Sequence, residues 1–169
     1  MQLTEVDRHY QNEEKLNAYS HGLGVLLALI GSYFLIKKVN ADYRYGLVAV
    51  VIYCISLVVL FSSSTLYHLA HRKPIKDKLR ILDHISIYFL IAGTYTPVAL
   101  ITLIDGNGWT IFYVVWGIAA VGTILKLFFT GKFEVISLLL YVFMGWLIVF
   151  DFQNLLTQTT TEGLILLGL

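Results

Sequence analysis

The sequence predicts an all-α integral membrane protein, in which several helices cross the bilayer and pack into one bundle. The first observation is the composition: 57% of the 169 residues are hydrophobic and 14% are charged, whereas soluble domains contain about 25% charged residues. The second is that the ionised residues are clustered and leave five long uncharged stretches. The third is an uneven distribution of Lys and Arg among the connecting segments. Together these features exclude an ordinary soluble enzyme domain and a disordered chain.

The five stretches without Asp, Glu, Lys or Arg contain 21, 27, 21, 20 and 16 residues. About 20 helical residues cross the roughly 30 Å of hydrocarbon in a bilayer, and the last stretch reaches this length by extending to Phe152. Because lipid offers the backbone no hydrogen-bond partner, the stretches must be helices and not open strands. Pro97 is expected to kink the third helix. We predict membrane spans near residues 17–37, 46–70, 84–104, 109–129 and 134–152.

The two ends of the chain differ from these spans. Residues 1–16 are predicted to form a cytoplasmic N-terminal segment, because they are acidic and polar and lack the basic start and apolar stretch of a signal peptide. Residues 17–169 then form a single transmembrane domain. The apolar run 163–169 is too short to cross a bilayer, and we expect it to be the start of a sixth helix.

The distribution of basic residues predicts the orientation. Lys and Arg favour cytoplasmic segments. With the N-terminus inside, nine of the 12 basic residues lie in inner segments and three in outer ones, so we predict a cytoplasmic N-terminus. The inner residues are Arg8, Lys15, Arg72, Lys73, Lys76, Lys78, Arg80, Lys126 and Lys132.

Charge and cysteine content exclude two further classes of protein. The net charge is +1, so the chain has no basic field that would attract a nucleic acid. Its single cysteine, Cys54, allows neither an intrachain disulfide nor a zinc ribbon.

Polar side chains at membrane depth are costly and are therefore candidates for function. Ser64 and His68 lie four residues apart at the inner end of the second predicted span, on one face of the helix. Asp83 and His84 begin the third span, and His21 lies in the first turns of the first span. Topology therefore brings these five side chains to the cytoplasmic leaflet from three different helices.

Several chemistries suit such a cluster. Neutral imidazole and carboxylate are ordinary zinc ligands, and a catalytic zinc keeps about three protein ligands and one water. A nearby carboxylate serves as a base for that water, and a serine stabilises a developing oxyanion. A proton relay or a pore lining is the alternative interpretation of the same residues.

At these residues the chain resembles a known family. The Ser64-x-x-x-His68 pattern is similar to the zinc motif of the hemolysin III family, the bacterial branch of the progestin and adipoQ receptor (adiponectin receptor-like) superfamily. Further segments resemble family motifs in the same order along the chain. They are residues 13–24 (EEKLNAYSHGLG), 82–88 (LDHISIY), 92–97 (AGTYTP) and 141–146 (YVFMGW).

The resemblance implies a seven-helix bundle with an internal N-terminus and a zinc ion near the cytoplasmic leaflet. It implies that His68 is a zinc ligand, that Asp83 holds or activates the zinc-bound water, and that Ser64 supports Asp83. In the family, two more ligands come from an H-x-x-x-H pattern in the seventh helix, and no such pattern occurs in these 169 residues. We therefore expect a truncated or incomplete family member, in which a zinc ion would need His21 or His84 as an auxiliary ligand.

Two classes of function follow from the residues and the resemblance. The first is a zinc-dependent intramembrane hydrolase that acts on a lipid amide or ester, with Asp83 and Ser64 as catalytic residues. The second is a non-enzymatic protein of membrane homeostasis, or a hemolytic, pore-type protein that causes cytolysis. A receptor role is weaker because the predicted outer loops are short. The expected partners are membrane lipids, with no nucleic acid, and the expected location is the bacterial inner (plasma) membrane.

Overall fold

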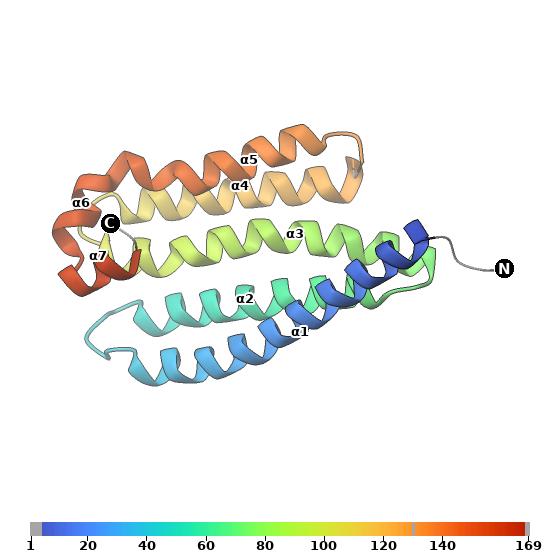
Figure 1. The fold of residues 1–169 in the computed structure, drawn as a ribbon. Helices are drawn as coiled ribbons and strands as arrows, with labels where there is room; N and C mark the ends of the chain where they lie inside the picture. Colours follow the sequence, from blue (N-terminus) through green and yellow to red (C-terminus); the bar gives the residue numbers. More distant parts are fainter. Residues whose placement is uncertain (1–4, 130, 168–169) are drawn as a thin grey trace.

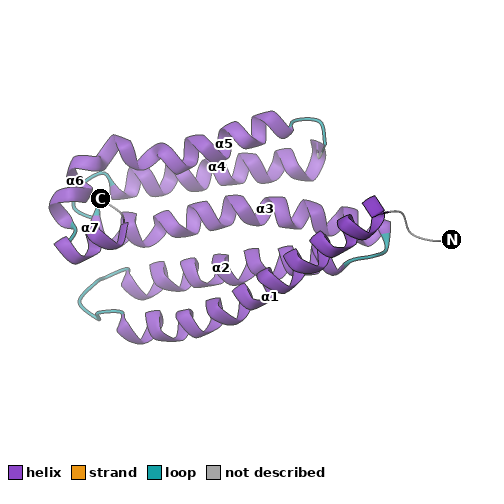
Figure 2. Cartoon of the chain, in the orientation of Figure 1, coloured by secondary structure: helices purple, strands orange, loops and turns teal. Residues whose placement is uncertain are grey.

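The computed structural model describes residues 5–129 and 131–167, and within these ranges the chain is helical, with no strand (Figures 1 and 2). Among these described residues, five helices are long and apolar enough to cross a membrane, which confirms the predicted fold class. The elements in chain order are α1 (Glu5–Lys38), α2 (Gly46–Leu69), α3 (Lys73–Pro97), a π-helical segment η1 (Val98–Thr102), α4 (Gly108–Phe129), α5 (Glu134–Trp146), a 3₁₀ segment η2 (Leu147–Asp151), α6 (Phe152–Gln158) and α7 (Thr161–Leu167).

Helices α2 and α4 begin and end within one residue of the spans predicted for them. Helices α1 and α3 begin earlier, at Glu5 and Lys73, because hydropathy marks only the apolar part of a longer helix. The additional turns are rich in Glu, Lys and Arg, which are good helix formers, and α3 also has a proline in its first turn. Both helices therefore extend beyond the apolar layer at the end predicted to be cytoplasmic.

The backbone after Pro97 departs from α-helical geometry. Proline has no N–H group to donate within the helix, and the segment Val98–Thr102 that follows it is π-helical. The N–H of Leu103 donates to the carbonyl of Val98 over 2.9 Å, which keeps the backbone satisfied. The predicted kink thus takes the form of a local widening of the helix.

The last predicted elements are also modified in the structure. The fifth span is built from α5, the 3₁₀ segment η2 and α6, so the helical path continues to Gln158 rather than ending near residue 152. Only Thr159 and Thr160 separate α6 from α7. Helix α7 covers the described part of the predicted run 163–169, and residues 168–169 lie outside the described residues.

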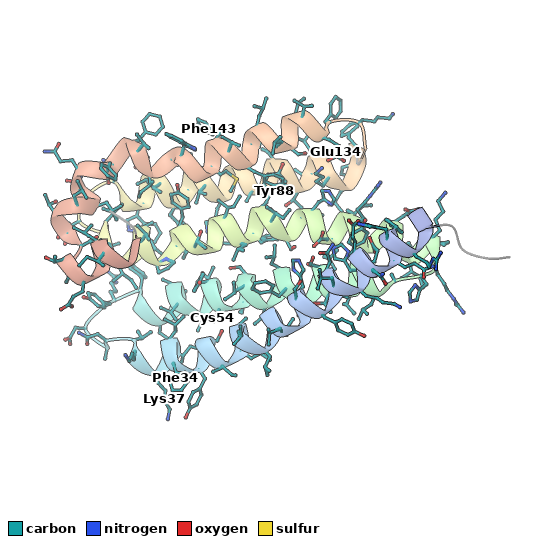
Figure 3. All side chains as sticks on the ribbon, viewed as in Figure 1. Phe34, Lys37, Cys54, Tyr88, Glu134 and Phe143 are labelled. Atoms are coloured by element: carbon teal, nitrogen blue, oxygen red, sulfur yellow. The ribbon has the colours of Figure 1, made fainter. Side chains whose placement is uncertain are left out.

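The long helices run side by side (Figure 1). Helix α1 packs on α2, α2 on α3, and α3 on α4, while α5 lies against α3 and α4. The main apolar core fills the space between α3, α4 and α5 around the fully buried Tyr88. On the outside, Phe34 and Phe143 point away from the bundle (Figure 3) and are at least half exposed, as suits side chains that face lipid.

Small residues set the spacing of α2 and α3. Ser63 Oγ on α2 donates to Ser86 Oγ on α3 over 2.9 Å. Ser56, seven residues before Ser63 in α2, lies directly against Gly93, seven residues after Ser86 in α3. The two contacts fix an antiparallel register, and small residues at such positions let the helix backbones approach closely in lipid.

We expect Gly93→Ala to destabilise the bundle by about 1–3 kcal/mol, as overpacking of a filled interior does. A Cβ atom at position 93 would lie 2.1 Å from Ser56 Oγ and 2.7 Å from Ser56 Cβ, so the helices must separate. Thermal unfolding of the detergent-purified protein measures the effect. The control is Gly117→Ala on α4, where a Cβ atom meets nothing within 4 Å. Equal melting temperatures for the two variants would contradict the packing described for α2 and α3.

Candidate functional site

The candidate site lies where the beginning of α1, the end of α2 and the beginning of α3 meet, at the end of the bundle predicted to be cytoplasmic (Figure 1). Helices α1 and α2 are antiparallel, and Gly24 of α1 lies against the ring of Phe61 on α2. This close approach brings the preceding turns of α1 beside the last turns of α2. The side chains at membrane depth from the two helices therefore face each other.

His21 and His68 form a pair across α1 and α2. Their ring centroids are 5.9 Å apart and the ring planes are inclined by 30°. The Nδ1 atoms of both rings are buried and have no hydrogen-bond partner. The ring of Tyr67 lies 4.8 Å from that of His68, and the ring of Phe61 lies 5.9 Å from that of His21. Two buried imidazole nitrogens that make no hydrogen bond are unusual, because buried polar groups normally have one.

Glu14 connects this pair to the third helix. Its carboxylate Oε2 lies 3.5 Å from His68 Nδ1 and forms an ion pair with the ammonium group of Lys76 on α3. Lys76 also donates to the hydroxyl of Tyr10 over 3.4 Å and lies over the ring of Tyr67. One carboxylate thus joins α1 to both α2 and α3.

Neither Glu14 as a site residue nor its pairing with Lys76 is predicted above from the sequence. A signal was present, because Glu14 precedes His21 by seven residues, the spacing of two helical turns, with the buried Ala18 between them. The signal was obscured because we assigned residue 14 to a polar segment outside the first span. Only the extension of α1 to Glu5 places this carboxylate on the face that meets α2.

The predicted catalytic residues lie at the same level of the bundle. Ser64 is buried one turn before His68 on α2. Asp83 lies one turn before Ser86, and Ser86 bonds to Ser63 across the two helices. The register therefore puts Asp83 opposite the last turns of α2. Its carboxylate remains partly exposed.

His84 is engaged differently from His21. Its Nδ1 atom lies 2.6 Å from the carbonyl oxygen of Arg80 in its own helix. Its own carbonyl accepts a hydrogen bond of 2.9 Å from the hydroxyl of Tyr141 on α5. Close by, the buried Lys126 of α4 donates to Glu134 of α5 over 2.5 Å. His84 thus belongs to the contacts that attach α5 to α3.

The donor set fits a zinc ion only in part. Within residues 5–129 and 131–167, no group of three or more His, Cys, Asp or Glu side chains is arranged to hold a metal ion. A catalytic zinc takes about three protein ligands, whereas here His21 and His68 supply two imidazoles whose Nδ1 atoms make no hydrogen bond. The nearest carboxylate, Glu14, is already paired with Lys76. The described residues therefore provide suitable donors but not a complete zinc site.

Comparison with known proteins agrees with this architecture. The model of the Haemolysin-III related family matches residues 9–167. Hemolysin-3 of Bacillus cereus is 40% identical over 159 residues, which are 94% of this chain and 73% of that protein. The Hemolysin-3 homolog of Bacillus subtilis (strain 168) is also 40% identical, over 93% of this chain and 74% of that protein.

The chain belongs to the Haemolysin-III related family. A more distant relative is the human Monocyte to macrophage differentiation factor, which is 28% identical over 90% of this chain and 64% of its own length. No solved structure matches the chain. Membership of the Haemolysin-III related family, together with five helices long enough to span a bilayer, identifies a multi-pass membrane protein.

In this Haemolysin-III related protein we expect Glu14 and Lys76 to be energetically coupled. The two side chains are 17% and 21% exposed, and removal of one partner leaves a largely buried charge unpaired. Glu14→Gln and Lys76→Gln should each lower the melting temperature, and a double-mutant cycle should yield a coupling of about 1–2 kcal/mol.

The control for this cycle is Glu13→Gln, one residue away. Glu13 pairs with His9 on the exposed side of the same helix, where the side chains are 60% and 77% exposed. Such surface pairs contribute little, so this variant should unfold like the wild type. Additive effects of Glu14→Gln and Lys76→Gln would show that the ion pair does not join α1 to α3.

Proposed function

We propose that this protein is a zinc-dependent hydrolase of lipid amides or esters, with its site at the cytoplasmic leaflet. The observation that carries the proposal is the pair of buried Nδ1 atoms of His21 and His68: neither makes a hydrogen bond, and His68 Nδ1 faces the Glu14 carboxylate at 3.5 Å. Neutral imidazole nitrogens are common zinc ligands. A bound zinc would polarise a carbonyl group and lower the pKa of a water molecule.

The roles of the chain's own residues follow from their positions. His68 and His21 would hold the metal, and the carboxylate of Glu14, whose Oε2 lies 3.5 Å from His68 Nδ1, would place a negative charge beside it. Asp83, opposite the last turns of α2, would accept the proton of the attacking water. The hydroxyl of Ser64, one turn from His68, would support the carboxylate of Asp83 or donate a hydrogen bond to the substrate oxygen.

The surroundings of the histidine pair support a lipid substrate. Leu23 lies two residues from His21 and Leu66 lies two residues from His68, and both leucines are more than half exposed on the outside of the bundle. Acyl chains in the bilayer therefore reach the edge of the site without entering water. In the orientation predicted from the basic residues, a carbonyl group near the headgroup end of a lipid would lie at the depth of these residues.

A second candidate function is non-enzymatic: hemolysis or another effect on membrane integrity. The lack of a three-ligand group among the described residues supports it, as does the name Hemolysin-3 of the relative from Bacillus cereus. On this hypothesis the histidine pair and its carboxylate stabilise the bundle and take no part in chemistry.

For the zinc site we expect about one zinc per chain in elemental analysis of the detergent-purified protein. His68→Ala and His21→Ala should each lose most of this zinc, because either change leaves a single imidazole donor. His71→Ala is the control, since His71 is exposed between α2 and α3. Folded wild-type protein without zinc, after incubation with the metal, would refute the zinc proposal and leave the second candidate.

For the reaction we expect release of fatty acid from a panel of lipid amides and esters in proteoliposomes. Asp83→Asn should lower the rate by about 10²–10⁴-fold, the usual contribution of a general base. Asp77→Asn removes the same charge from an exposed position of α3 and should have little effect. If His68→Ala and Asp83→Asn leave erythrocyte lysis by the protein unchanged while no lipid is hydrolysed, the non-enzymatic function is supported instead.

A further inference from the structure

A second site lies at the opposite end of the bundle from the histidine pair. The connection between α1 and α2 and the connection between η1 and α4 both lie at this end (Figure 1), and residues in and beside them line an open cavity of about 380 Å³. This volume is within the range of about 300–1,000 Å³ that is typical of small-molecule sites. Leu100 of η1 and Ile104 of the second connection complete the wall. The charged and aromatic residues that line the cavity are Asp42, Tyr43, Arg44, Tyr45, Asp105 and Trp109.

The two connections are held together across the cavity. The rings of Tyr45 and Trp109 meet edge to face with centroids 5.2 Å apart. In the first connection, the backbone N–H of Asp42 donates to the side chain of Asn40 over 3.1 Å, and the N–H of Gly46 donates to Tyr43 O over 2.9 Å. The wall of the cavity is therefore an ordered structure formed by short connections.

A glycine closes the second connection. A Cβ atom at Gly108 would lie 2.1 Å from the carbonyl oxygen of Ala99 and 2.5 Å from that of Leu103, so only glycine permits this tight start of α4. The N–H of Gly108 donates to Leu103 O over 2.9 Å. This close turn places Asp105 and Trp109 in the wall of the cavity, next to the first connection.

The charges around the cavity are not neutralised by one another. Asp42, Arg44 and Asp105 form no ion pair within the described part of the chain. The guanidinium group of Arg44 lies 5.2 Å from the centre of the Tyr45 ring, which orients it along the wall. One cavity thus presents two carboxylates, one guanidinium and three aromatic rings to a ligand.

This combination suits a ligand that carries both a cation and an anion. Carboxylates and aromatic faces attract an ammonium group, while a guanidinium binds phosphate through paired hydrogen bonds. The cavity lies beside the ends of four membrane-spanning helices, at the boundary where tyrosine and tryptophan meet lipid headgroups. Directly after the first connection, Leu47 and Val48 are more than half exposed on α2 and offer a surface for acyl chains.

We propose that this cavity binds the headgroup of a zwitterionic phospholipid of the phosphatidylethanolamine type. Arg44 contacts the phosphate, Asp42 and Asp105 contact the ammonium group, and the aromatic rings of Tyr43 and Trp109 add attraction for the cation. The ligand is a membrane lipid and not a soluble metabolite, because the acyl chains continue along Leu47 and Val48. This site is independent of the zinc proposal, since none of its residues belongs to the histidine pair.

The experiment is a lipid titration of the full chain by native mass spectrometry, with phosphatidylethanolamine and phosphatidylglycerol of identical acyl chains. We expect the wild type to bind phosphatidylethanolamine about tenfold more tightly, because phosphatidylglycerol has no ammonium group to meet the carboxylates. The double variant Asp42→Asn/Asp105→Asn should lose this preference. Arg44→Gln should weaken the binding of both lipids.

Matched controls keep the test specific. Asp77→Asn and Arg72→Gln remove the same charges at the other end of the bundle and should bind both lipids like the wild type. Size-exclusion chromatography shows whether each variant is folded. If the double variant is not, the single variant Asp105→Asn takes its place in the titration. Equal binding of the two lipids by the wild type overturns the proposal, as does a preference that survives the loss of both carboxylates. Displacement of the lipid by an equal concentration of soluble phosphoethanolamine overturns the assignment to a membrane lipid.

Discussion

The need to satisfy every backbone hydrogen bond inside hydrocarbon determines most of this structure. Each N–H or C=O group left without a partner in lipid costs several kcal/mol, so the apolar stretches become continuous helices. The exceptions have local explanations. After Pro97 the helix widens into a π segment whose backbone is still bonded, and η2 continues the helical path beyond α5. Tyr95 helps at this second irregularity, because its hydroxyl accepts from the N–H of Ile148 and donates to the carbonyl of Gly145.

The same constraint explains where polar side chains gather. In the middle of the bundle, serine and threonine hydroxyls bond back to their own helices, as Ser56 and Thr96 do. Ionised groups gather at the two ends of the bundle. At one end α1 and α3 extend beyond the apolar layer, and at the other short connections join the helices. The histidine pair with Glu14 and the cavity beside Arg44 are therefore two chemically different sites on opposite sides of one bundle.

The fold was largely predictable from the sequence, because charge is excluded from lipid so strongly that uncharged stretches delimit the spans. Helices α2 and α4 illustrate this, since charged or turn-forming residues flank both of them closely. The beginnings of α1 and α3 were not predictable from hydropathy, which does not register a polar continuation of a helix. The prediction that His21, His68 and Asp83 lie at the same end of the bundle followed from the topology of the spans. The partners of each side chain did not, because Glu14 and Lys76 are 62 residues apart and their pairing depends on how α1 crosses its neighbours.

That separation along the chain also has a consequence for biogenesis. At about 5–20 residues per second of synthesis, Lys76 leaves the ribosome roughly 3–12 s after Glu14, given their separation of 62 residues. During this interval α1 and α2 emerge as a hairpin in which Glu14 lacks the ammonium group of Lys76. The arrival of α3 then completes the ion pair between α1 and α3. Insertion of the third helix is thus the step at which the first becomes committed to its final position.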